Sequence, residues 1–126
     1  MAPVASDQRK VGKIPPGRFK SVYASGRRAV GQRIILFHDE PEAPMAFAAV
    51  ASRKVGNAVR RNRAKRLMRE AFRLHLGRLR CGGAYILVAR AGIEGSKSPE
   101  VAGELEKLLT RLELLSESMS RNDDAR

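Results

Sequence analysis

The sequence predicts an α/β two-layer sandwich, in which one sheet packs against helices. Three observations carry this prediction: an apolar run at 33–38, an unbroken apolar run at 84–89, and apolar residues at helical spacing both after Asn57 and from 101 to 115. Short runs rich in β-branched and aromatic residues are typical of strands, whereas a 3.6-residue period is typical of helices. The expected order is α-β-β-β-α-β-α, with a βαβ crossover around the second helix. General statistics favour a right-handed crossover.

The first helix is predicted at 17–24. Pro15-Pro16-Gly17 favours its start and Ser25-Gly26 its end. Phe19 and Tyr23 are four residues apart, so both rings lie on one face of this helix.

Three strands are expected next, a short one at 28–31 and longer ones at 33–38 and 45–51, the last two joined by a proline-bounded turn at 39–44. Side chains alternate between the two faces of a strand. The second strand therefore has Ile35 and Phe37 on one face and Ile34, Leu36 and His38 on the other.

The second helix belongs to the most basic part of the chain. Residues 53–80 contain eleven Arg or Lys and one acid, Glu70, and so hold +10 of the overall net charge of +12. At about 100° per residue, the helix has a core face and a cationic face. The core arc comprises Ala64, Leu67, Met68, Ala71 and Leu74, and the cationic arc Asn62, Lys65, Arg66, Arg69 and Arg73.

The start of this helix is rich in cations. Asn57 is a good N-cap, and the nearby cations are Lys54, Arg60, Arg61 and Arg63. The helix dipole favours acids at this end, by roughly 0.3–1 kcal/mol each, and the sequence provides none there. Converging N–H groups and cationic side chains instead suit an anion. A merely solvated basic face is the alternative, but clustering on this scale is typical of nucleic-acid binding.

The apolar run at 84–89 is predicted to be a central strand covered on both faces. A last helix follows, capped by Ser98-Pro99, and its period is set by Val101, Leu105, Leu108, Leu109, Leu112 and Leu115. This helix carries more acids than cations, so we expect it to serve in packing.

Length and composition predict one RNA-binding domain at 15–116, with a flexible basic arm at 1–14 and a polar tail at 117–126. The pI near 11.0 indicates a polyanionic partner. The sequence has no apolar run near 18 residues and no signal-like N-terminus, so a cytoplasmic protein without a membrane partner is expected. The lone Cys81 is interpreted as a small residue near a turn.

No catalytic set is evident. His38 and His75 are isolated and are interpreted as structural, Asp39, Glu40 and Glu42 as solvated turn residues, and Ser52 has no base beside it. The sequence therefore predicts binding and positioning, with catalysis supplied by another component. Phe19, Tyr23 and Phe37 are open to two interpretations: core residues, or a surface on which unpaired bases stack.

The segment ASRKVGNAVRRNRAKRLMREAF closely resembles the signature of the protein subunit of bacterial ribonuclease P. Weaker similarity extends over about 15–115. The resemblance implies that the partners are a large catalytic RNA and precursor tRNA, whose 5′ leader the holoenzyme removes, and that no further protein partner is required. It also implies that the RNA is the catalyst, that Mg²⁺ is held mainly by RNA and substrate and not by the protein alone, and that the crossover is left-handed.

The resemblance also assigns site residues. It places Arg53, Lys54 and Asn57 on the loop that leads into the RNA-contacting helix, and Arg61, Asn62, Arg63, Lys65, Arg66 and Arg69 on that helix. The charge pattern adds Arg60 and Arg73 to the predicted RNA-binding residues. The resemblance places Phe19, Tyr23, Ile35 and Phe37 in the cleft for the single-stranded leader, to which we add Ser52. Two departures stand out. Ala49 and Ala51 replace the family's frequent Gly, Ser or Val, which we expect to alter polar contacts in the cleft, and Tyr23 replaces a common Phe.

Three alternatives stay open. A ribosomal-protein-like or chaperone RNA-binding module would share the charge and the fold class, because fold alone does not decide function. A stand-alone nuclease would be active without RNA. A major-groove DNA reader is disfavoured, because the basic helix lacks the turn and companion helix of a helix-turn-helix unit.

Overall fold

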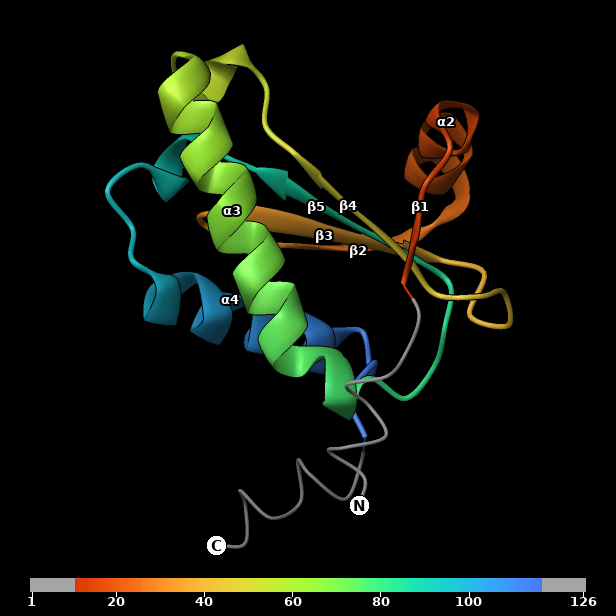
Figure 1. Ribbon diagram of the computed structural model, residues 1–126. Helices are drawn as coiled ribbons and strands as arrows, with labels where there is room; N and C mark the ends of the chain where they lie inside the picture. The colour runs from red at the N-terminus through yellow and green to blue at the C-terminus, as the bar shows by residue number, and fades with distance from the viewer. Residues whose placement is uncertain (1–10, 117–126) are drawn as a thin grey trace, which may run out of the picture.

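The computed structural model describes residues 11–116 and contains one five-stranded sheet with helices on both faces (Figure 1). The strand order is β1-β4-β5-β3-β2. The strands are β1 (Gly12–Lys13), β2 (Arg27–Val30), β3 (Ile34–Asp39), β4 (Ala46–Val50) and β5 (Ala84–Ala89). The α-helices are α2 (Pro16–Ser25), α3 (Ala58–His75) and α4 (Ser98–Arg111), and the short 3₁₀ turns are η1 (Arg53–Val55), η2 (Leu76–Arg78) and η3 (Ala91–Ile93).

The expected crossover is present. β4 and β5 are parallel neighbours, in register from Ala46↔Ala84 to Val50↔Val88, and α3 connects them. β5 is central, because its other edge pairs with β3 in antiparallel fashion. These pairings confirm the α/β sandwich and the predicted position of the 84–89 strand. The left hand of the crossover stays a prediction from the family resemblance.

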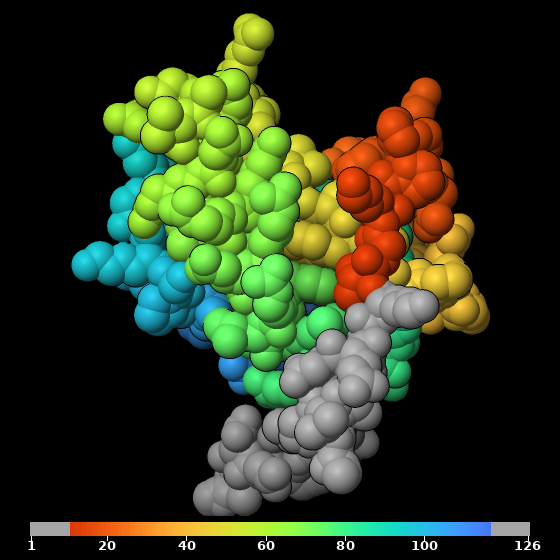
Figure 2. Space-filling view, viewed as in Figure 1, coloured from red at the N-terminus to blue at the C-terminus, as the bar shows by residue number. Residues whose placement is uncertain are grey.

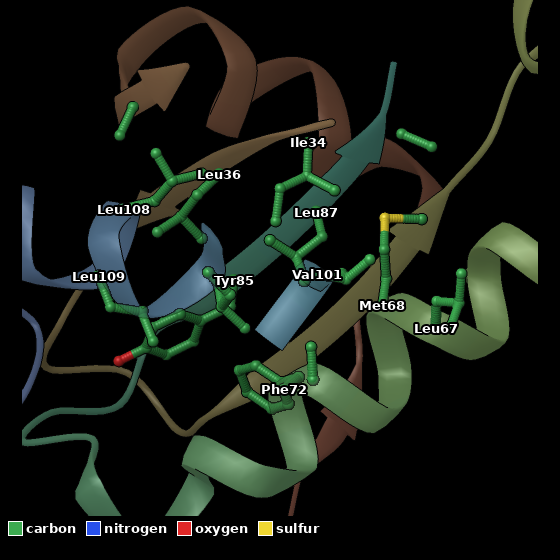
Figure 3. Packing of buried hydrophobic residues seen from close by; sticks show 14 of the residues in the cluster. Ile34, Leu36, Leu67, Met68, Phe72, Tyr85, Leu87, Val101, Leu108 and Leu109 are labelled. Carbon is green, nitrogen blue, oxygen red and sulfur yellow. The ribbon is translucent and has the colours of Figure 1, made fainter. Parts of the chain in front are cut away.

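We call the side of the sheet under α3 and α4 the sealed face. Its core joins Ile34, Leu36, Tyr85 and Leu87 of the sheet to apolar residues of both helices (Figure 3). On α3 the buried residues are Ala64, Leu67, Met68, Ala71, Phe72 and His75. The prediction for Leu74 was wrong, since 69% of its surface is exposed. Phe72 is buried instead, with its ring stacked on Phe47 at a centroid distance of 4.2 Å.

We call the other side the open face. α2 covers part of it, and the core there is small, comprising Ile14, Val22, Phe37, Ala84 and Ile86. A row of apolar side chains crosses four paired strands beyond this cluster: Val30, Ile35, Val88 and Val50. Val30 is 43% exposed and the other three are half-buried. The expectation that β5 is covered on both faces therefore holds except at Val88, which is half-buried on the open face.

Two boundaries differ from the predictions. Residues 12–13 pair with β4 and Ile14 is buried, so packing begins before residue 15; most of the predicted arm (1–10) and the predicted tail (117–126) lie outside the described residues. The N-cap of α4 is Lys97 and not Ser98, whose hydroxyl donates to Glu70 Oε1 at 2.9 Å. Within residues 11–116, no helix is long and apolar enough to cross a membrane.

Candidate nucleic-acid interface

The start of α3 is built as the sequence predicts. The Asn57 side chain accepts a hydrogen bond from Arg60 N at 3.0 Å, and that of Ser52 accepts one from Lys54 N at 3.2 Å. Gly56 between them has φ +137°, a conformation that residues with a Cβ rarely adopt. This loop leaves Ser52, Arg53 and Lys54 exposed at the end of β4.

Three cations near the start of α3 are tethered to the protein. Arg60 pairs with Glu94 Oε2 at 3.1 Å, Arg61 Nη1 donates to Gly56 O at 2.9 Å, and Arg63 Nη2 donates to Ser96 O at 2.7 Å. Both Glu94 and Ser96 belong to the loop between β5 and α4. We refer to Arg60, Arg61 and Arg63 as the tethered cations. Arg60 and Arg63 join this loop to α3, whereas Arg61 holds the loop that leads into α3.

The predicted cationic arc of α3 has no such partners. No hydrogen bond or ion pair within residues 11–116 involves the side chains of Asn62, Lys65, Arg66, Arg69 or Arg73. All five are exposed except Lys65, which is half-buried. We refer to these residues as the free row. The positions follow from the helical period, since the free row lies opposite the residues that α3 buries.

A hollow lies between the start of α3 and α2, and Figure 2 shows it with atoms of β4 as its floor. The cleft aromatics are on the α2 side of it. The centroids of the Phe19 and Tyr23 rings are 6.2 Å apart, and those of Tyr23 and Phe37 are 4.7 Å apart in a T-shaped arrangement. Tyr23 is 40% exposed, whereas Phe37 is 9% exposed and packs mainly in the core. Partial burial raises the pKa of the Tyr23 phenol, so this group is neutral and able to donate a hydrogen bond at pH 7.

The predicted cleft residues are brought to one side of the sheet. Ile35 shares the open face with Phe19 and Phe37, and exposed Ser52 follows the strand that forms the floor. The sequence analysis missed Val88 and Val50, which extend this apolar surface. Their alternation with buried neighbours is invisible in an unbroken apolar run, because only the register with β3 for Val88, and with β5 for Val50, shows which side each residue faces.

The expectation for Ala49 and Ala51 was wrong. Both side chains pack against the core of the sealed face, whereas Ala48 and Val50 pack on the open face. Substitutions at these two alanines therefore do not change polar contacts in the hollow.

Apart from Glu42, the side chains considered for catalysis have structural partners. Burial lowers the pKa of His38, whose Nε2 lies 2.8 Å from Gly82 O, and His75 Nδ1 lies 2.9 Å from Ala71 O. Asp39 and Glu40 are not merely solvated, since both contact α2. No group of three His, Cys, Asp or Glu residues in the described part of the chain could hold a metal ion.

Comparisons with known proteins agree with this geometry. The family model described as Ribonuclease P matches residues 15–113. The ribonuclease P protein component of Symbiobacterium thermophilum is 40% identical over 100 residues, covering 77% of this chain and 86% of that protein. That of Pseudomonas fluorescens is 35% identical over 102 residues, covering 79% and 76%.

Solved structures show the same fold. The ribonuclease P protein of Staphylococcus aureus superposes with a TM-score of 0.72 at 22% identity, covering 85% of this chain and all of that one. That of Thermotoga maritima gives 0.70 at 25% identity, covering 79% and 96%. Because the family model matches residues 15–113 and a curated relative is 40% identical over 77% of this chain, this protein belongs to the ribonuclease P protein family, the protein subunits of the RNA-based endoribonuclease that matures the 5′ ends of tRNA.

Proposed function

We propose that this subunit binds its two RNA partners through two adjoining surfaces. The catalytic RNA is assigned to α3 and its leading loop, and the single-stranded leader of precursor tRNA to the hollow. The RNA-binding residues are then Arg53, Lys54, Asn57, Arg60, Arg61, Asn62, Arg63, Lys65, Arg66, Arg69 and Arg73. The leader-binding residues are Phe19, Tyr23, Ile35, Phe37 and Ser52.

One observation carries this proposal: an uncovered apolar surface lies directly beside the densest cluster of cations. The free row offers charges without protein partners, which suits phosphate contacts that depend on charge more than on base identity. The open face offers the exposed Tyr23 and the half-buried Ile35, which suits stacking and apolar contact with unpaired bases. A duplex would not need the second surface.

Catalysis is assigned to the RNA, and we assign Mg²⁺ to the RNA and the substrate. The carboxylates of the described residues do not gather into a metal site. The contribution that we assign to the protein is electrostatic and comes from the cations of α3 and its leading loop. Cations placed between phosphates reduce their mutual repulsion. The protein should therefore lower the Mg²⁺ concentration that cleavage requires, in a cytoplasmic ribonucleoprotein.

The leader surface is tested with Tyr23→Ala in the reconstituted holoenzyme. If Tyr23 stacks on a leader base, affinity for precursor tRNA falls by about 1–3 kcal/mol. Mature tRNA has no leader, so its affinity stays unchanged. Tyr23→Phe is the matched control, because it retains the ring and should retain most of the affinity.

The contrary result would return Tyr23 to the core. In that case Tyr23→Ala weakens precursor and mature tRNA alike and lowers the melting temperature strongly, as removal of a buried ring does. The 40% exposure of Tyr23 argues for the first outcome.

The division of labour is tested by assaying precursor cleavage with protein alone, RNA alone and both together over a Mg²⁺ series. We expect no cleavage by the protein alone and a lower Mg²⁺ requirement for both than for the RNA. Cleavage by RNA-free protein would show instead that the chain carries its own active site.

A further inference from the structure

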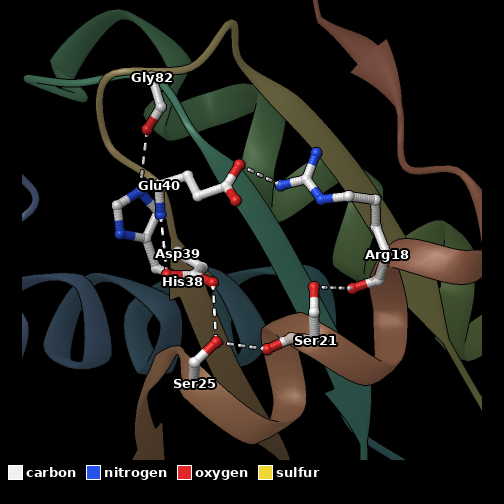
Figure 4. A network of polar contacts seen from close by, with 7 residues as sticks. All are labelled: Arg18, Ser21, Ser25, His38, Asp39, Glu40 and Gly82. Carbon is white, nitrogen blue, oxygen red and sulfur yellow. Dashed lines mark hydrogen bonds and ion pairs between the residues drawn. The ribbon is translucent and has the colours of Figure 1, made fainter.

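α2 is attached to the rest of the domain through few elements. It packs on β3 through the small open-face core, and it stands apart from α3 and α4 in Figure 1. Its first turn also makes an ion pair, in which Arg18 Nη2 lies 2.8 Å from Glu40 Oε1 in the β3–β4 turn (Figure 4). The only acidic partner of α2 beyond this pair, within residues 11–116, is the neighbouring Asp39.

The last turn of α2 approaches the same place. A Cβ at Gly26 would lie 2.9 Å from His38 O and 3.3 Å from Asp39 Cβ, so only glycine permits this contact. The Ser25 hydroxyl lies 2.8 Å from Ser21 O, its main acceptor, and 3.4 Å from Asp39 Oδ2 (Figure 4). Both ends of α2 therefore meet Asp39-Glu40.

The β3–β4 turn, which both ends of α2 contact, is held in place by contacts of its own. Glu40 has φ +55°, and its N–H donates to Asp39 Oδ1 at 2.9 Å. A Cβ at Gly83 would lie within 2.6 Å of the carbonyl oxygens of both Asp39 and Glu40, so the turn presses on the start of β5. The neighbouring His38 Nε2 is 2.8 Å from Gly82 O. These contacts hold the backbone of Glu40 in place, and the carboxylate extends from this fixed position.

Tyr23 lies on α2 between the two attachment points, and its ring contacts that of Phe37 in a T-shaped arrangement. From this geometry we infer that Glu40, through its ion pair with Arg18, is a positioning residue that sets the place of α2 and thereby the width of the leader-binding hollow. The inference rests on the proposed leader-binding function. Glu40 itself does not contact the leader, because it acts through Arg18 and α2.

Removal of Glu40 should change the affinity for RNA in the direction opposite to that expected for the loss of an acid. Removing an acid from an RNA-binding protein ordinarily strengthens RNA binding, because repulsion between the acid and the phosphates is lost. It would also release Arg18 to bind phosphate. If Glu40 positions α2, its removal instead weakens binding of the precursor while leaving mature tRNA unaffected.

The test compares Glu40→Ala with Glu42→Ala in the reconstituted holoenzyme. Glu42 is exposed in the same turn, and no hydrogen bond or ion pair of it occurs within residues 11–116. Both variants lose one negative charge, but only Glu40→Ala breaks the Arg18–Glu40 ion pair, which we call the clamp. We expect about two- to fivefold weaker precursor binding for Glu40→Ala, the scale of an exposed ion pair. Glu42→Ala should bind equally or slightly more tightly.

Arg18→Ala completes the comparison. Once Arg18 is absent, Glu40→Ala should cause no further loss of precursor affinity, because the two residues act as one clamp. Equal effects of Glu40→Ala in both backgrounds, or tighter binding by both Glu40→Ala and Glu42→Ala, would overturn the inference.

A second measurement needs no RNA. The chain has no Trp and two Tyr, of which Tyr85 is buried, so quenching of tyrosine fluorescence by acrylamide reports mainly on Tyr23. Glu40→Ala should increase quenching, and Glu42→Ala should not. Unchanged quenching together with full precursor affinity would contradict the clamp, even where Tyr23→Ala confirms leader binding. Failure of Tyr23→Ala to affect the leader, despite increased quenching in Glu40→Ala, would instead contradict the proposed function.

Discussion

The two faces of the sheet differ in how completely they are covered. On the sealed face, two helices enclose a continuous core in which Leu36, Met68 and Leu105 are fully buried. On the open face, one short helix covers a small cluster and leaves Ile35 and Val88 half-buried and Val30 exposed. Burial of apolar area stabilises by roughly 25 cal/mol per Å². Most of the folding free energy therefore resides on the sealed face, which leaves the open face able to bind.

The largest effect expected is on the sealed face. Met68→Ala removes a fully buried side chain of α3 and should lower the free energy of unfolding by about 2–5 kcal/mol, measured by urea denaturation. Ile35→Ala should lower it by roughly 1 kcal/mol, because half-buried Ile35 has less area to lose. For RNA binding the order should be reversed. Ile35→Ala should weaken binding of precursor tRNA but not of mature tRNA, and Met68→Ala should cause no such leader-dependent loss. Equal losses of stability would remove the distinction between the two faces.

The attachments of the two helices should differ in the same direction. Glu104 of α4 accepts hydrogen bonds from Arg33 N at 2.7 Å and Ile34 N at 3.0 Å, and pairs with Arg33 Nη1 at 3.0 Å. Its side chain is only 10% exposed. Glu104→Ala leaves these donors without partners and should lower the free energy of unfolding by about 2–4 kcal/mol.

The loss of stability expected for Glu104→Ala is to be compared with the losses in two other variants. Glu40→Ala breaks the exposed pair that holds α2 and should cost no more than about 1 kcal/mol of stability. Glu113→Ala, at an exposed acid after α4, should stay within about 0.5 kcal/mol. If Glu104→Ala were as mild as Glu113→Ala, α4 would be held by its apolar contacts alone.

These comparisons show where prediction from sequence succeeds. The bounds of β5 and the N-cap Asn57 were predicted residue by residue, because an apolar run between glycines and an Asn before a helix are local signals. β1 was missed because two residues carry no period, and Gly12 and Lys13 become a strand only by pairing with β4. Leu74 and Phe72 both lie near the edge of the apolar arc. The stack with Phe47, distant in sequence, decides which of them is buried.

The candidate site shows the same limit. Helical spacing placed the free row correctly on the exposed side of α3. It could not separate this row from the tethered cations, because Glu94 and Ser96 reach α3 only through the fold.

The tethered cations and the free row should respond differently to substitution. Arg66→Ala should leave stability unchanged, while the salt dependence of RNA binding falls by roughly 0.7–0.9 in log–log slope for one lost phosphate contact. Arg63→Ala should also lower the free energy of unfolding, by about 1 kcal/mol, because the bond to Ser96 O is lost. Titration of the RNA at several salt concentrations, with urea denaturation alongside, measures both quantities. A destabilised Arg66→Ala with an unchanged slope would mean that the RNA-binding side of α3 is misassigned.

The smallest effect expected is a pH dependence of stability, caused by His38 on the sealed face of the sheet. The His38 ring is 4% exposed and lies 4.4 Å from the Tyr85 ring. Burial lowers the pKa of His38, while the hydrogen bond with Gly82 O and the charge of Asp39 oppose that change in part. The unfolded chain, with a histidine pKa near 6.5, then binds a proton more readily than the folded chain.

Stability contributed by neutral His38 is therefore complete above about pH 6.5 and declines as the pH falls below that value. His38→Gln retains a donor for Gly82 O but does not titrate. The melting temperature of the unsubstituted protein should fall more between pH 7 and pH 5 than that of His38→Gln. Because Tyr23 does not titrate in this range, leader affinity corrected for the folded fraction should stay constant. Parallel pH profiles for the two proteins would show that the solvation of His38 changes little on folding.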